Sequence, residues 1–132
     1  MKGDPRNPAD WLKLALRDLT SARGCLRDQN LYLAVFCLEQ AAEKALKGWL
    51  ICTGWSLVKT HDLERLMHDC AAYGVDLAWC LPSARRLKRL YLTDRYVDES
   101  PDPEPDVAET GRLLADVERL IQCLFPSSPP SL

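Results

Sequence analysis

The apolar side chains near the start of the chain recur every three or four residues, which is the spacing of one helix face. The positions are Trp11, Ala15, Leu19, Ala22 and Leu26. The preceding Asn7-Pro8 is a favourable helix start, because asparagine caps free amides and proline suits the first helical position. We therefore expect a first helix over about residues 8–28.

A second and wider apolar stripe begins after the short break at residues 28–30 and predicts a helix over about 31–53. The stripe consists of Leu31, Ala34, Val35, Leu38, Ala41, Ala42, Ala45, Leu46, Trp49 and Cys52. A face this wide is typical of a central helix with more than one neighbour. The polar exceptions are Glu39, Gln40, Glu43, Lys44 and Lys47.

Three shorter helices are expected after a loop at residues 53–56. The third has Thr60 as its cap and Asp62 in its first turn, and it stops near Gly74. The fourth opens at residues 81–83 and the fifth covers about 106–124. In the fourth, the inward residues are Leu87, Leu90 and Tyr91, and the outward residues are Arg85, Arg86, Lys88 and Arg89. The stripe of the fifth consists of Val107, Leu114, Val117, Ile121 and Leu124.

No strand pattern competes with these helices, so the prediction is an all-α protein, an up-and-down bundle of four to five helices. Residues 94–106 are rich in Asp, Glu and Pro and are expected to form a loop. We expect residues 1–132 to form a single domain with its core over about 8–125 and a flexible Pro/Ser-rich tail at 126–132.

Composition narrows the function classes. The formal net charge is -2, so any nucleic-acid surface must be a local one. The apolar stretches are too short for a membrane span and the N-terminus does not resemble a signal peptide, which predicts a cytoplasmic protein without membrane association. The six cysteines show no CxxC spacing, so we expect free thiols, no metal site and no cofactor.

Two polar clusters are candidates for binding an anion. Gln40, Lys44 and Lys47 lie three or four residues apart on one helix, where lysines can meet phosphate as point charges. Lys59 and His61 flank Thr60 at an expected helix start, whose free amides favour anions, and His61 can also act as a general acid or base. The alternatives are a solvated helix surface and a simple cap.

Two further clusters follow the same logic. Arg95 can fork onto phosphate and Tyr96 can stack on a base. The basic stretch at residues 85–89 can follow a phosphate backbone. In the alternative interpretation, Arg95 pairs with a nearby acid and the basic stretch serves only solubility.

Four motifs in this order resemble the HEPN domain family, in its branch of small stand-alone prokaryotic proteins. They are Ala15/Asp18-Leu19/Ala22, Gln40 to Lys47, Lys59 to Leu63, and Arg95-Tyr96-Val97-Asp98. The resemblance covers roughly residues 9–125. It implies a helical bundle that usually dimerises, and a member of a toxin-antitoxin-like pair with a minimal nucleotidyltransferase, a nucleotide-binding module or a metal-independent endoribonuclease.

In the ribonuclease members an arginine precedes a histidine with four to six residues between them, and this chain lacks that pattern at both His61 and His68. The leading hypothesis is therefore a non-catalytic protein that binds a nucleotide or RNA. The expected binding residues are Lys44, Lys47, Lys59, His61, Arg95 and Tyr96. The alternatives are a dimeric endoribonuclease using His61 and Arg95, and an interaction module that docks on a nucleotidyltransferase through Trp55, Leu57 and Trp79.

Overall fold

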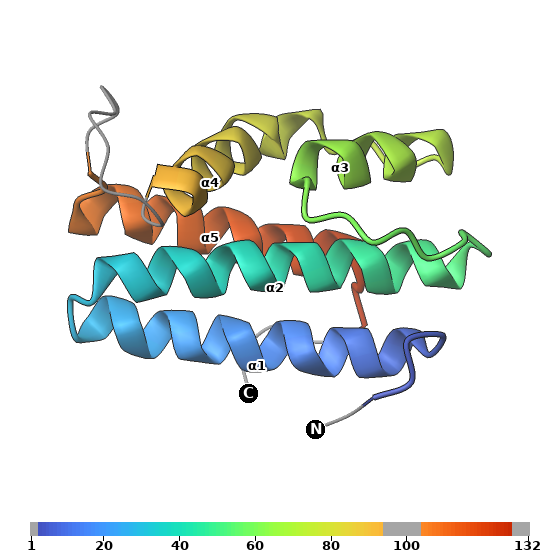
Figure 1. The fold of residues 1–132 in the computed structure, drawn as a ribbon, viewed down its shortest axis with the longest axis horizontal. Coiled ribbons are helices and arrows are strands. Elements are labelled where there is room, and N and C mark those ends of the chain that lie inside the picture. The colour runs from blue at the N-terminus through green and yellow to red at the C-terminus, as the bar shows by residue number, and fades with distance from the viewer. Residues whose placement is uncertain (1–2, 94–103, 128–132) are drawn as a thin grey trace.

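The computed structural model describes residues 3–93 and 104–127, and this part of the chain is an all-α bundle (Figure 1). Its elements are α1 (Pro8–Arg27), α2 (Leu31–Cys52), α3 (Leu63–Ala72), the 3₁₀ turn η1 (Ala78–Cys80), α4 (Leu81–Thr93) and α5 (Val107–Leu124). The predicted fold class is confirmed.

The helices α1 and α2 form an antiparallel hairpin with a tight connection (Figure 1). The predicted cap Asn7 accepts from the amide of Ala9, and Asn30, within the expected break, caps α2 by accepting from the amide of Leu33. The two helices approach closely at Gly48, where an added Cβ would lie 2.8 Å from the Cβ of Trp11. Local sequence therefore fixes this pair of helices at both ends.

The central helix is α2, which packs against α1, α3, α4 and α5. In Figure 1, α1 runs alongside it on one side and α3 and α4 lie on the other, with α5 behind. Its buried positions are Ala34, Val35, Leu38, Glu39, Ala41, Ala42, Glu43, Ala45, Leu46, Lys47, Gly48 and Leu50. The wide apolar stripe thus serves several neighbours, and three ionisable side chains are buried with it.

Some details differ from the predictions. Helix α3 begins at Leu63 because the side chain of Asp62, not of Thr60, accepts from the first helix amides. In α5, Val107 is exposed, and Leu113 and Leu120 lie in the core instead. No helix among the described residues has the length and apolar character needed to cross a membrane.

Candidate functional site

Helix α2 buries a row of ionisable side chains, which the packing of an apolar core does not require. Glu39, Glu43 and Lys47 are each four residues apart, so they share one face, and each is at most 6% exposed. The Lys47 ammonium donates to Glu43 Oε2 at 3.1 Å. Because burying charge is costly unless it is paired, this row is a candidate for function.

The row reaches the surface at His61, in the loop before α3. Its Nδ1 lies 2.8 Å from Oε1 of Glu43, so one buried carboxylate holds both His61 and Lys47. The His61 side chain is 73% exposed, whereas that of Glu43 is 5% exposed. A carboxylate at Nδ1 favours a proton on that nitrogen and leaves Nε2 to bond to a ligand.

Glu39 lies one turn earlier on α2 and makes a different contact. The side-chain amide of Gln40 donates to Glu39 Oε2 at 2.7 Å. Burial raises the pKa of the Glu39 carboxyl to about 7, because the charged form loses its hydration. The row therefore holds one carboxyl that exchanges a proton near neutral pH beside one that is ion-paired.

The structure places the other predicted lysines apart from this row. Lys44 binds Asp18 of α1 at 2.5 Å, and both side chains are largely buried. Lys59 is exposed in the loop before α3 and has no ion pair with any residue the structure describes. Of the four predicted site residues that are described, Lys47 and His61 alone meet at one carboxylate.

The start of α3 carries its own anion. The carboxylate of Asp62 accepts from the amides of Glu64 and Arg65, so these amides are already bonded. The same carboxylate lies 3.4 Å from Lys88 of α4. The cation of α4, rather than the bare helix end, is what a phosphate would meet here.

The basic stretch of α4 divides between two neighbours. Arg85 forms two hydrogen bonds with Glu64 of α3, at 2.9 and 3.1 Å. Arg86 was predicted to face outward, but it is buried and forks onto Glu109 of α5 at 2.8 and 3.0 Å. The Arg86 prediction is wrong because α5 packs against the side of α4 that the charge pattern assigned to solvent.

The tryptophans of the interaction-module alternative are engaged within the fold. The Trp55 indole donates to Asp69 at 3.1 Å, and the Arg119 guanidinium lies 4.1 Å from the ring centre of Trp79. Both rings are partly buried against the core, while Leu57 is exposed. Arg95 and Tyr96 lie outside the described residues.

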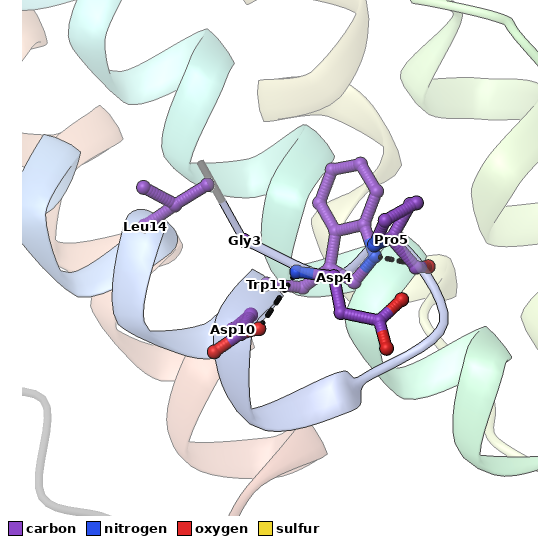
Figure 2. A pocket seen from close by; sticks show the side chains of 6 residues that line it. All are labelled: Gly3, Asp4, Pro5, Asp10, Trp11 and Leu14. Carbon is purple, nitrogen blue, oxygen red and sulfur yellow. Dashed lines mark hydrogen bonds between the residues drawn. The ribbon is translucent and has the colours of Figure 1, made fainter. Parts of the chain in front are cut away.

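A hydrogen-bonded clamp joins the segment before α1 to the first turns of α1 (Figure 2). The Trp11 indole donates to the carbonyl of Pro5 at 2.9 Å, and the amide of Asp4 donates to the Asp10 carboxylate. These residues line a small hollow of about 130 Å³. The ring of Trp11 lies 5.8 Å from the Lys47 ammonium, so it helps to cover that charge.

The sequence interpretation missed Glu43 as a site residue. The sequence does carry a signal for it. So many positions of α2 are apolar that few can face solvent, and Glu43 and Lys47 fall within the apolar stripe. The contact to His61 joins residues 18 positions apart, which helical spacing alone does not reveal.

Comparison with known proteins places the chain in a family context. The family model of the HEPN domain matches residues 8–125. Among solved structures, TT1696 from Thermus thermophilus is similar, with 25% identity and a TM-score of 0.79 over 92% of this chain and 98% of that one. ST0689, described as an archaeal HEPN homologue, has 27% identity and a TM-score of 0.72 over 96% and 98%. No functionally curated protein matches this chain.

Proposed function

Because the chain belongs to the HEPN domain family, we propose that it binds RNA or nucleotide phosphate on the face that carries His61. The observation that supports this most directly is the Glu43–His61 contact, in which a buried carboxylate orients an exposed imidazole. In its doubly protonated form, an imidazole held in this way donates its Nε2–H to an incoming phosphate oxygen without first losing rotamer freedom.

Cations around His61 favour an anionic ligand. Lys88 lies beside Asp62, which directly follows His61, and the exposed Lys59 precedes it by two residues. A phosphate that approaches Nε2 would gain Coulomb attraction from both ammonium groups. Arg95 and Tyr96 belong to the same proposal on the basis of the sequence motif alone.

The lysines of α2 take a supporting part in this proposal. Lys47 holds Glu43 in place, and Lys44 holds Asp18, so each ammonium is already compensated by a carboxylate. Lys88 is also paired, with Asp62, but that pair lies at the surface, where the ammonium can exchange its carboxylate for a phosphate. We therefore assign Lys47 as a positioning residue for the imidazole and Lys59 and Lys88 as the phosphate contacts.

Fluorescence anisotropy with a short labelled single-stranded RNA at low salt tests the proposal. We expect His61→Ala to weaken binding about tenfold, or about 1.4 kcal/mol. His68→Ala is the matched control, because His68 is also an exposed histidine, but its partner Glu64 lies 3.7 Å away and is not buried. Equal affinity of the wild type and His61→Ala, or no binding of RNA and nucleotides at all, would contradict the proposal.

The same contact favours a second candidate, a metal-independent ribonuclease. A carboxylate-bound histidine is suited to general acid–base catalysis. His61 would take the proton of a 2′-hydroxyl, the 2′-oxygen would bond to phosphorus, and the 5′-oxygen would leave with a proton from water. Cleavage that persists in EDTA and stops both with His61→Ala and with a 2′-deoxy substrate would support an enzyme.

The expected assembly is a homodimer, with a minimal nucleotidyltransferase as protein partner in a toxin-antitoxin-like pair. Family membership supports association, and sedimentation at micromolar concentration measures it. A chain that stays monomeric alone and when mixed with a purified minimal nucleotidyltransferase would remove this part of the proposal.

A further inference from the structure

A stacked aromatic pair joins α2 to α4 outside the core. The ring centres of Phe36 and Tyr91 lie 5.9 Å apart with an angle of 19° between the planes. Phe36 is 38% exposed, and Tyr32, one turn earlier on α2, is 53% exposed. Leaving large aromatic surface in water is unfavourable, so this pair is a candidate contact for a ligand.

The pair lies on the same two helix edges that lead to His61. On α2, Phe36 precedes Glu43 by two turns, about 10 Å along the axis. On α4, Tyr91 follows Lys88 by about one turn, and Lys88 contacts Asp62 beside His61. In Figure 1 the last turn of α4 lies over the first half of α2, and α3 begins farther along α2.

We propose that Phe36 and Tyr91 form a stacking site for an unpaired nucleobase of an RNA strand. This inference rests on the proposed function, because the phosphate of the same strand is the one placed at His61. Aromatic rings stack on the faces of bases irrespective of their identity, and neighbouring cations hold the backbone. The site therefore selects single-stranded RNA over duplex RNA, whose bases are already stacked on one another.

The size of the apolar patch favours a base over a protein partner. Its exposed large side chains are Tyr32, Leu33 and Phe36, which are 53%, 40% and 38% exposed. Together they supply a few hundred Å² at most, whereas a stable protein interface buries about 800 Å² per partner. The other large apolar side chains exposed in the described residues lie on other elements, at Leu57, Tyr73 and Val107.

The test compares two RNAs of about eight nucleotides. One is intact oligoadenylate, and the other carries an abasic site at a single position that is moved along the strand. We expect Phe36→Leu to weaken binding of the intact RNA at least about fivefold, which corresponds to the lower end of the free energy contributed by stacking of one base. At one abasic position the variant and the wild type should bind equally. Tyr73→Leu, at another exposed aromatic residue, is the matched control and should change nothing.

The other outcomes separate the two proposals. If neither RNA nor a nucleotide binds, the proposed function fails and stacking fails with it. If a nucleotide binds but no RNA does, the stacking site for an RNA strand is overturned while the proposed function stands. If RNA binds and depends on His61 but Phe36→Leu binds as the wild type does, the stacking site alone is overturned. If Phe36→Leu dissociates an oligomer in sedimentation and leaves RNA affinity unchanged, the patch is a protein contact.

Two control measurements accompany the test. Circular dichroism of each variant verifies the fold. Measuring the affinity for AMP in parallel with that for RNA distinguishes a site for a free nucleotide from a site for a strand.

Discussion

At the scale of single residues, α2 carries three ionisable side chains at buried positions, which are usually occupied by apolar residues. They are Glu39, Glu43 and Lys47. Glu43 and Lys47 compensate each other and His61 also contacts Glu43, whereas Glu39 forms no ion pair with a described residue and accepts a hydrogen bond from the amide of Gln40. A buried ion pair rarely stabilises more than apolar residues of the same volume would. The row is therefore better explained by what it does for His61 than by stability.

The Glu39 carboxyl predicts a pH dependence of stability. Burial raises its pKa to about 7 from an ordinary 4.5, so between these values the folded protein binds more protons than the unfolded chain. The free energy of unfolding contributed by this group therefore falls as pH rises through that window, by on the order of 3 kcal/mol. Glu39→Gln should raise Tm by several degrees at pH 8 and leave it nearly unchanged at pH 4.5. Equal Tm differences at both pH values would contradict this.

At the scale of elements, two glycines inside helices predict opposite effects of the same substitution. An added Cβ at Gly48 of α2 would lie 2.8 Å from the Cβ of Trp11 and 3.3 Å from the backbone oxygen of Pro8, so α1 would have to move. At Gly111 of α5 an added Cβ meets nothing within 4 Å. Gly48→Ala should cost about 1–3 kcal/mol of unfolding free energy by overpacking, and Gly111→Ala should add about 0.5–1 kcal/mol. Urea denaturation measures both, and a stabilising Gly48→Ala would refute the close approach.

The arginines of α4 predict a second contrast between elements. Arg86 is buried and forks onto Glu109 of α5, whereas the neighbouring, exposed Arg85 forks onto the half-exposed Glu64 of α3. Arg86→Ala should lower the unfolding free energy by about 1.5–3 kcal/mol, because Glu109 loses a charged hydrogen-bond partner. Arg85→Ala should change it much less, because solvent screens this surface pair. Denaturation midpoints of the two variants test this, and equal losses would contradict it.

At the scale of the whole molecule, the proposed binding of RNA would rely on a local surface, because the net charge is -2. With Lys59, His61 and Lys88 as the contacts, about three phosphates are neutralised. The logarithm of the binding constant should then fall with the logarithm of salt concentration with a slope of about -2 for a single strand. Anisotropy titrations over a series of salt concentrations measure the slope. A slope several times steeper would indicate a much larger basic surface than the proposed one.

The sequence predicts the parts of the fold that local interactions determine. Asn7 caps the helix expected of it, and the stripe of α2 indicates a central helix. It does not predict the surroundings of Arg86 or Glu43, because these depend on which distant helix or loop packs alongside. For the candidate site, His61 is evident from its motif, but the carboxylate that orients it becomes visible only in three dimensions.

The N-terminal clamp connects the residues before α1 to the candidate site through a series of contacts. The carbonyl of Pro5 holds the Trp11 indole, and the Trp11 ring covers the Lys47 ammonium. Lys47 in turn shares the Glu43 carboxylate with His61. A truncation that removes Pro5 would take away the acceptor of the Trp11 indole, and with it part of the cover over Lys47, which helps to hold the Glu43 carboxylate that orients His61. Recombinant protein for ligand screening should therefore keep residues 3–11 intact.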